Sequence, residues 1–163
     1  MTTKINEKQI FTSYLIIGAG CSGLSLAIKL IDNKKFTEKV ILLEARENYF
    51  DDRSWCFWEK KCHILSGIVS KKWYSWTFSK LKGESYTGSS KKFSYQYIRS
   101  IDFYKYCIKK IKSTSNFSII NSCKVNNITK KNKNYIIKTN HGSFTCQYII
   151  DTRPKKNSFI KET

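Results

Sequence analysis

The chain has 163 residues, of which 40% are hydrophobic and 15% aromatic; this composition excludes an intrinsically disordered protein and suffices for one domain with a core. Its 30 Lys and Arg residues against 12 Asp and Glu residues give a formal net charge of +18. The lysines are dispersed, and no helix-turn-helix, zinc-finger or RNP-like sequence accompanies them. We therefore read most of the charge as solvated surface and expect no nucleic-acid partner. Attraction to an anionic membrane surface is the other role that such charge allows.

No segment of the sequence has the pattern of a targeting or membrane-spanning element. Residues 1–13 are mostly polar and lack the apolar stretch of a secretory signal, and no apolar run reaches the length of about 18 residues that a spanning helix needs. The six cysteines form no C-x-x-C pair, and the chain has only two histidines. We expect reduced thiols, no metal site and a cytoplasmic location.

The most informative segment is a short apolar run, Tyr14 to Ile17, followed by a glycine-rich turn and an apolar-periodic stretch from Leu24 to Ile31. The pattern predicts a strand, a G-x-G-x-x-G turn and a helix, which together are typical of dinucleotide-binding proteins. The first glycine permits the tight turn, the second lets the backbone approach a pyrophosphate, and the third lets helix and strand pack closely. The predicted cofactor-binding residues of this turn are Gly18, Ala19, Gly20, Cys21 and Gly23.

A second predicted strand, Val40 to Leu43, ends in Glu44, about twenty residues past the glycines, where a carboxylate can accept hydrogen bonds from both ribose hydroxyls of an adenosine. We therefore add Glu44 to the predicted cofactor-binding residues and expect it to favour an unphosphorylated ribose. Arg46 follows two residues later. Its side chain is expected either to be solvated or to contact the adenine.

The rest of the chain continues as an α/β protein. We expect an aromatic-rich loop over residues 47–67, two further strands, and a helix that Ser100 or Asp102 caps and that runs to about Lys112. A third parallel strand and an antiparallel meander with a turn at Asn140 to Gly142 follow. The expected later strands are Lys72 to Phe78, Phe93 to Ile98, Phe117 to Ile120, Val125 to Ile128, Tyr135 to Thr139 and Ser143 to Tyr148. The predicted fold is a Rossmann-like FAD/NAD(P)-binding domain with a parallel sheet and an antiparallel β-meander, incomplete at the C-terminus.

Three further segments carry a more specific pattern. These are Arg53 to Trp58, with the form R-[ST]-W-x-F-W, Tyr95 to Tyr104, with the form Y-x-Y-I-R-S-x-D-F-Y, and Asp151 to Arg153, with the form D-[ST]-R. Together with the glycine turn they resemble the flavin-dependent lycopene cyclases, over nearly the whole chain and in the same order. The first motif is shared by many flavoproteins, whereas the tryptophan-rich and Tyr-Ile-Arg segments are much more specific.

The resemblance implies FAD as cofactor, reduced in the active state, with NAD(P)H as a possible reductant. It implies a non-redox, isomerase-type cyclisation of acyclic carotene ends to ionone rings, and a carotenoid substrate that the enzyme reaches from the membrane surface without spanning it. Family members are longer, and their later part supplies an acidic residue implicated in catalysis that has no counterpart here. We therefore expect residues 1–163 to be the N-terminal part of a flavoprotein domain and to be inactive alone, and no catalytic residue is assigned.

Arginine is scarce in this lysine-rich chain, which has only four, so Arg53, Arg99 and Arg153 suggest a need for a planar guanidinium, and for Arg53 and Arg99 we expect a place at a flavin or substrate site. A surface salt bridge is the alternative for each. We also assign Val125 and Asp151 to the cofactor site by resemblance, with Val125 contributing backbone and its side chain in the core, while Asp151 could instead form a turn. The aromatic residues of Arg53 to Trp58 are either a local hydrophobic cluster or a wall for a polyene.

Two other functions remain open. One is another FAD-dependent enzyme of the same fold, a monooxygenase or a prenyl reductase, for which a D-G motif after the meander would be the sign; Asp151-Thr152-Arg153 stands there instead. The other is a basic nucleic-acid-binding protein, which would bind DNA with a steep salt dependence and without flavin.

Overall fold

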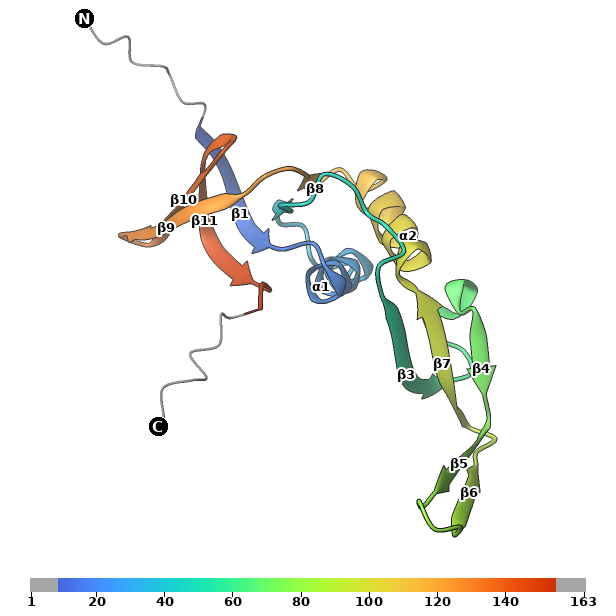
Figure 1. The fold of residues 1–163 in the computed structure, drawn as a ribbon. Coiled ribbons are helices and arrows are strands. Elements are labelled where there is room, and N and C mark those ends of the chain that lie inside the picture. The colour runs from blue at the N-terminus through green and yellow to red at the C-terminus, as the bar shows by residue number, and fades with distance from the viewer. Residues whose placement is uncertain (1–8, 155–163) are drawn as a thin grey trace, which may run out of the picture. The chain divides into compact units, whose positions relative to one another are not determined.

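A computed structural model of the chain describes residues 9–154 (Figure 1). These residues form two compact units, one made of residues 9–48 and 107–154 and the other of residues 49–106. Helix α2, Ser100–Lys112, begins in the second unit and ends in the first. The glycine turn lies in the first unit, and the tryptophan-rich segment lies in the second.

The described part of the first unit contains a six-stranded sheet and helix α1, Cys21–Asp32. Its strand order is β8-β2-β1-β11-β10-β9, in which the pairs from β8 to β11 are parallel and the last two pairs are antiparallel. The strands are β1 (Gln9–Ile17), β2 (Val40–Leu43), β8 (Phe117–Ile120), β9 (Val125–Lys131), β10 (Asn134–Thr139) and β11 (Gly142–Asp151). The predicted α/β fold, with a parallel sheet and an antiparallel meander, is confirmed.

The central strands of this sheet are buried on both faces, as is usual for parallel strands. All four residues of β2 are buried, and Leu15, Ile16 and Ile17 of β1 are at most 2% exposed. On one face the side chains of alternate residues form a continuous apolar core that continues into β10 and β11. Its members are Leu15, Ile17, Ile41, Leu43, Cys123, Ile137, Phe144 and Cys146. This core fixes the ends of β1 and β2, where the predicted site residues lie.

One predicted strand of the meander is longer than expected and has a second role. The structure extends Ser143 to Tyr148 into the ten-residue β11, which pairs antiparallel with β10 and parallel with β1 (Figure 1). Ile17 of β1 therefore lies opposite Asp151 of β11. Consequently the chain that follows β11 reaches the glycine turn.

The second unit contains a three-stranded antiparallel sheet in the order β3-β7-β4 and a two-stranded hairpin of β5 and β6. A short 3-10 helix, Ser66–Ile68, precedes β4. The strands are β3 (Ser54–Lys60), β4 (Lys71–Trp73), β5 (Ser75–Ser79), β6 (Ser85–Ser89) and β7 (Phe93–Arg99).

Two sequence predictions in this unit are wrong. Residues 47–67 are not all loop, because they contain β3; aromatic residues on both faces of that strand, such as Phe57 and Trp58, hide the usual apolar–polar alternation. The predicted strand from Lys72 to Phe78 is broken at Tyr74, because the segments before and after it pair with different partners, β7 and β6.

The start of α2 also differs from the prediction. Neither Ser100 nor Asp102 caps the helix; instead Asp51 Oδ1 accepts hydrogen bonds from Ser100 Oγ at 3.3 Å and from Ile101 N–H at 3.5 Å. The Ser100 hydroxyl oxygen accepts the Arg53 N–H at 3.1 Å. A cap that is 50 residues away along the chain leaves no local pattern.

Candidate dinucleotide-binding site

The turn after β1 is shaped by two glycines that leave no room for a side chain. Gly18 has a φ of +91°, and a Cβ there would lie 2.8 Å from Thr152 Oγ1. A Cβ at Gly23 would lie only 2.0 Å from the carbonyl oxygen of Gly18, so the first turn of α1 packs directly on the backbone at the end of β1. These are the steric roles that the sequence predicted for the first and third glycines.

Gly20 is different, because a Cβ at this position would meet no protein atom within 4 Å. It directly precedes Cys21, the first and exposed residue of α1. No side chain caps this end of the helix at Gly20, and no acidic residue lies in its first turn. The partial positive charge of the helix N-terminus is therefore not neutralised from within the helix, and the open space beside Gly20 can admit an anionic group.

Glu44 follows β2 and turns back toward the glycines. Its Oε2 accepts the Ala19 N–H at 2.8 Å, and its Oε1 accepts the Arg46 N–H at 3.0 Å. The Arg46 guanidinium donates to both carboxylate oxygens, at 3.2 and 3.3 Å, and its Nη2 also reaches the Ala19 carbonyl at 3.4 Å. The side chain of Glu44 is 8% exposed. The Arg46 side chain is therefore not simply solvated, because it is bound to Glu44, the predicted ribose-binding acid.

The ionisation of Glu44 is set by two opposing effects. Burial alone would raise the pKa of this carboxyl group and is the largest single contribution. The hydrogen bonds from Arg46 and Ala19 together outweigh it, so the pKa lies below its ordinary value. Glu44 is therefore an ionised acceptor at neutral pH.

The end of β11 completes the edge of the site. The Thr152 N–H donates to the Ile17 carbonyl at 2.9 Å, and its hydroxyl lies 2.9 Å from the Ile17 carbonyl oxygen and 3.0 Å from that of Gly18. The sequence analysis did not identify Thr152 as a site residue. Two signals were available: its place in the D-[ST]-R motif, and its position directly after a strand, because the carboxyl ends of parallel strands meet at one edge of a sheet.

Asp151, the last residue of β11, lies at the same edge. Arg153 donates to both of its carboxylate oxygens, at 2.9 Å from Nε and 2.6 Å from Nη2. The guanidinium of Arg153 holds the pKa of this carboxyl group below its ordinary value. Both side chains remain about two-fifths exposed, at 40% and 43%. Asp151 is thus ionised, close to the glycine turn and partly accessible.

Val125, the first residue of β9, is half-buried and packs against the core of the first unit. The chain leading into it is held beside the predicted acid, because the Cys123 N–H donates to the Glu44 carbonyl at 2.8 Å. The structure therefore brings most of the predicted cofactor residues to the carboxyl edge of β1, β2 and β11, with the segment before Val125 next to them.

The two remaining predicted residues lie in the second unit, where each has an acidic neighbour. Arg99 Nε and Nη2 both donate to Asp51 Oδ2, at 2.9 and 2.7 Å, and this guanidinium lowers the pKa of the Asp51 carboxyl group. Arg53 Nε lies 3.7 Å from Asp52 Oδ2, with its side chain 70% exposed. The guanidinium of Arg99 is therefore bound to Asp51, the residue that caps α2, whereas the Arg53 side chain makes only a long and exposed ion pair with Asp52.

The tryptophan-rich segment is a strand, so its aromatic residues face opposite sides. Trp55 packs edge-on against Phe103 and Tyr104 of α2, at centroid distances of 4.9 and 5.3 Å. Trp58 belongs to the other face of the sheet and is 48% exposed. The two residues therefore do not form one local cluster, which is one of the two roles that the sequence predicts for this segment.

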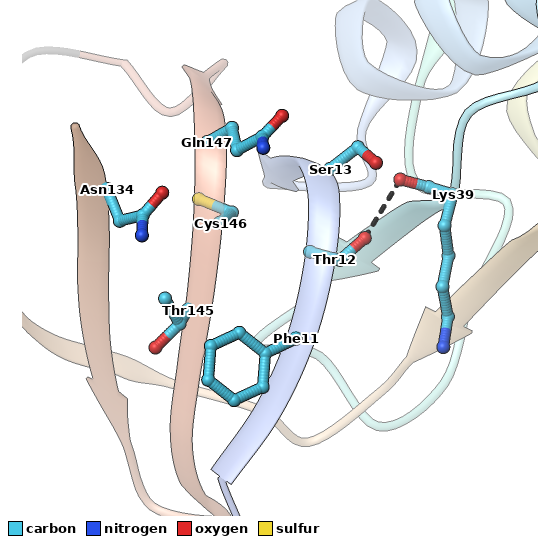
Figure 2. Close-up of a pocket in the computed structure, with 8 residues that line it drawn as sticks. All are labelled: Phe11, Thr12, Ser13, Lys39, Asn134, Thr145, Cys146 and Gln147. Carbon is cyan, nitrogen blue, oxygen red and sulfur yellow. Dashed lines mark hydrogen bonds between the residues drawn. The ribbon is translucent and has the colours of Figure 1, made fainter.

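A cavity of about 330 Å³ lies elsewhere in the first unit, along the amino-terminal half of β1 and the neighbouring part of β11 (Figure 2). The Thr12 hydroxyl donates to the Lys39 carbonyl at its border, at 2.9 Å. Its lining residues are Phe11, Thr12, Ser13, Lys39, Asn134, Thr145, Cys146 and Gln147. None of them belongs to the carboxyl edge, so this cavity is separate from the glycine turn.

The family of this chain follows from its match to the model of a known protein family. Residues 14–162 match the family model described as "Lycopene cyclase protein". The chain belongs to the lycopene cyclase family. No curated protein matches this chain at a significant level.

Solved structures with the same fold include enzymes, one of them in complex with FAD. The chain is similar to p-nitrophenol 4-monooxygenase PnpA from Pseudomonas putida DLL-E4, with a TM-score of 0.67 and 13% identity over 92% of this chain and 42% of that one. It is also similar to CtdE in complex with FAD and a substrate, with a TM-score of 0.66 and 14% identity over 86% and 37% of the chains.

A third similar structure is a geranylgeranyl bacteriochlorophyll reductase-like protein from Thermoplasma acidophilum, with a TM-score of 0.61 and 13% identity over 88% and 39% of the chains. At these identities the similarity establishes the fold alone. The chain spans less than half of the length of each of these three neighbours. Within residues 9–154, no helix is long and apolar enough to cross a membrane.

Proposed function

We propose that the first unit binds the adenosine diphosphate half of FAD and that the whole protein is a flavin-dependent lycopene cyclase. The observation that carries the cofactor part is the open space at Gly20 beside the uncapped N-terminus of α1. Two glycines of the turn are required by the packing of the protein itself, whereas Gly20 is not, so a bound group is the best reason for a glycine there. The family match supports the choice of reaction.

In this proposal the pyrophosphate lies against the Gly20 backbone and the first N–H groups of α1. Glu44 accepts hydrogen bonds from the adenosine ribose hydroxyls and disfavours a 2′-phosphate by charge repulsion. A carboxylate offers about four lone-pair positions, and Glu44 already accepts hydrogen bonds from the Ala19 N–H, the Arg46 N–H and the guanidinium of Arg46. Because these hydrogen bonds fill the lone-pair positions, the guanidinium of Arg46 must move away from Glu44 when the ribose binds. It can then lie beside the adenine ring.

Backbone near Val125 and the side chain of Asp151 complete the proposed cofactor contacts of the first unit. Arg53 and Arg99 are the proposed cofactor residues of the second unit, and Arg99 also positions the start of α2 through Asp51. When bound, reduced flavin supplies negative charge that stabilises a carotene cation, and NAD(P)H is the proposed source of the electrons. The reaction closes the acyclic ends of a carotene to ionone rings without net redox change. We propose this activity for the whole protein, because the chain matches only part of the longer neighbours.

The proposed substrate is apolar and resides in the bilayer, so the proposed working location is the cytoplasmic surface of a membrane, which the protein touches without crossing. The net charge of +18 is compatible with attraction to anionic lipids.

The test of the cofactor proposal is titration of the chain with FAD, followed by quenching of flavin fluorescence, for the wild type and for Gly20→Val. A Cβ at Gly20 meets no protein atom within 4 Å, so Gly20→Val should leave the fold intact, but the valine side chain would occupy the proposed pyrophosphate position. We expect affinity to fall by at least about 100-fold, which is roughly 2.7 kcal/mol.

Gly67→Val is the matched control, because a Cβ at Gly67 also meets no atom within 4 Å and this residue lies in the second unit. It should bind FAD as the wild type does. Equal FAD affinity of Gly20→Val and the wild type would refute the site. For the activity, the whole protein expressed in lycopene-accumulating bacteria should yield ring-bearing carotenes; lycopene left unchanged would refute the cyclase assignment.

A further inference from the structure

One face of the three-stranded sheet in the second unit is an exposed row of aromatic rings. The register places Trp58 of β3 and Trp73 of β4 on either side of Tyr95 of β7. The ring centroids lie 5.1 Å apart for Trp58 and Tyr95 and 6.0 Å apart for Trp73 and Tyr95. The three side chains are 48%, 38% and 37% exposed. Such a row is costly to leave in water, and in a soluble sheet the outer face is normally polar.

The β5–β6 hairpin extends this row. Its register places Trp76 opposite Gly88 and Phe78 opposite Tyr86, so the larger side chains share one face. A Cβ at Gly88 would lie 2.7 Å from the Trp76 ring, which shows that the indole lies over this glycine. The Trp76 ring meets the Trp58 ring edge-on at 4.6 Å and so joins the hairpin to the sheet.

The opposite face of the hairpin carries serine and threonine hydroxyl groups. The Thr77 and Thr87 hydroxyls lie 2.9 Å apart, and those of Ser79 and Ser85 lie 2.8 Å apart. The hairpin is therefore amphipathic, with all of its large apolar groups on one side. We define the aromatic face as Trp58, Trp73, Trp76, Phe78, Tyr86, Phe93 and Tyr95; a groove of about 520 Å³ runs along part of it, lined by five of these side chains and Ser75.

Lysine ammonium groups border the aromatic face. Lys71 Nζ lies 5.6 Å from the Trp73 ring centroid, Lys80 Nζ lies 5.7 Å from that of Tyr86, and Lys92 Nζ lies 5.8 Å from that of Phe93. Leu81, at the turn of the hairpin, is fully exposed and stands between Lys80 and Lys82 in the sequence. The surface thus combines an apolar centre, an apolar tip and a lysine-rich border, in which Lys80 is ion-paired with Glu84 while Lys71 and Lys92 lie beside Trp73 and Phe93.

We propose that the aromatic face is the surface by which the protein docks on a membrane that contains anionic lipids. Tryptophan and tyrosine favour the headgroup region of a bilayer, where the ring is buried and its polar atom stays wet. Lysines at the border can meet lipid phosphates while their stems cover apolar surface. A second copy of the chain fits less well, because the two lysine borders would repel each other. This inference rests on the membrane contact in the proposed function and names the residues that make it.

The test is sedimentation of the full chain with vesicles of phosphatidylcholine alone and of phosphatidylcholine mixed with phosphatidylglycerol. The wild type should bind the mixed vesicles, and Phe78→Ser and Leu81→Asp should each reduce the partition coefficient by about fivefold or more, because each removes apolar surface from the interface. Both side chains are exposed, 67% for Phe78, so folding should be preserved. Phe50→Ser is the matched control, because Phe50 is equally exposed but lies outside the aromatic face.

Binding of the wild type and of Phe78→Ser and Leu81→Asp to equal extents would overturn the docking surface and leave the membrane contact intact. No binding of the wild type to mixed vesicles would overturn both the surface and the membrane part of the proposed function. A concentration-dependent dimer that Phe78→Ser dissociates, without vesicle binding, would assign the face to a second copy and overturn the proposal. Flavin binding, measured in the same preparations, reports separately on the cofactor proposal.

Discussion

At the scale of single residues, Glu44 couples the end of β2 to the glycine turn through an ionised carboxylate. Its pKa is lowered in the folded protein, although burial opposes ionisation, because Arg46 and Ala19 donate hydrogen bonds to it. A lowered pKa means that the folded state binds this proton less readily than the unfolded chain does. The resulting stabilisation is complete above the ordinary pKa of a glutamate and is lost as the pH falls through the folded value.

We therefore expect Glu44→Gln to lower the free energy of unfolding at pH 7 by about 1–2 kcal/mol, since charge-assisted hydrogen bonds are replaced by neutral ones. The loss should shrink as the pH is lowered into the range in which Glu44 becomes protonated. Urea unfolding at pH 7 and pH 4 measures both quantities. Glu47→Gln, at an exposed position three residues later, is the control and should change little. An equal effect of Glu44→Gln at both pH values would show that ionisation is not the source.

Other single-residue roles were only partly accessible to sequence analysis. Glu44 could be predicted because its distance from the glycines follows from the length of one helix and one strand. The contacts of Thr152 could not, because its bonds to the Ile17 and Gly18 carbonyls depend on a parallel strand pairing across about 135 residues of chain. The same holds for Asp51, which caps α2 from a distant position.

At the scale of elements, the close contact of α1 with the end of β1 depends on Gly23. A Cβ there would lie 2.0 Å from a backbone oxygen, which cannot move without disturbing the turn, whereas a Cβ at Gly20 meets nothing. We expect Gly23→Ala to destabilise the chain by about 2–4 kcal/mol and Gly20→Ala to change stability by less than about 1 kcal/mol. Thermal and urea unfolding of the two variants measure the difference. Equal stabilities would contradict the packing seen at the turn.

Elements with a local signature were predicted closely, and those without one were not. β2 and β8 have the predicted bounds, because each is a short apolar run between polar residues. β3 was missed, since Trp55 and Trp58 place large rings on opposite faces of the same strand. The parallel pairing of β11 with β1 joins the two ends of the described chain, and no local pattern carries that information.

At the scale of the whole molecule, the dominant quantity is the charge: 30 Lys and Arg residues against 12 Asp and Glu residues. Most lysines must repel one another across the surface, and this repulsion favours the expanded, unfolded chain. Added salt screens it, because the Debye length falls from about 30 Å at 0.01 M to about 8 Å at 0.15 M. Stability should therefore depend on ionic strength even though the core of the first unit is apolar.

We expect the midpoint of thermal unfolding to rise by roughly 3 °C between 10 and 150 mM NaCl, which corresponds to about 1 kcal/mol for a chain of this length. Glycerol at equal osmolarity is the control for effects of the cosolute that do not involve charge. A midpoint that falls or stays constant would mean that self-repulsion is not significant. The same salt should weaken binding to anionic vesicles, because it screens the lysines at the border of the aromatic face from lipid phosphates. The opposite signs of these two effects separate general charge repulsion from the specific docking surface.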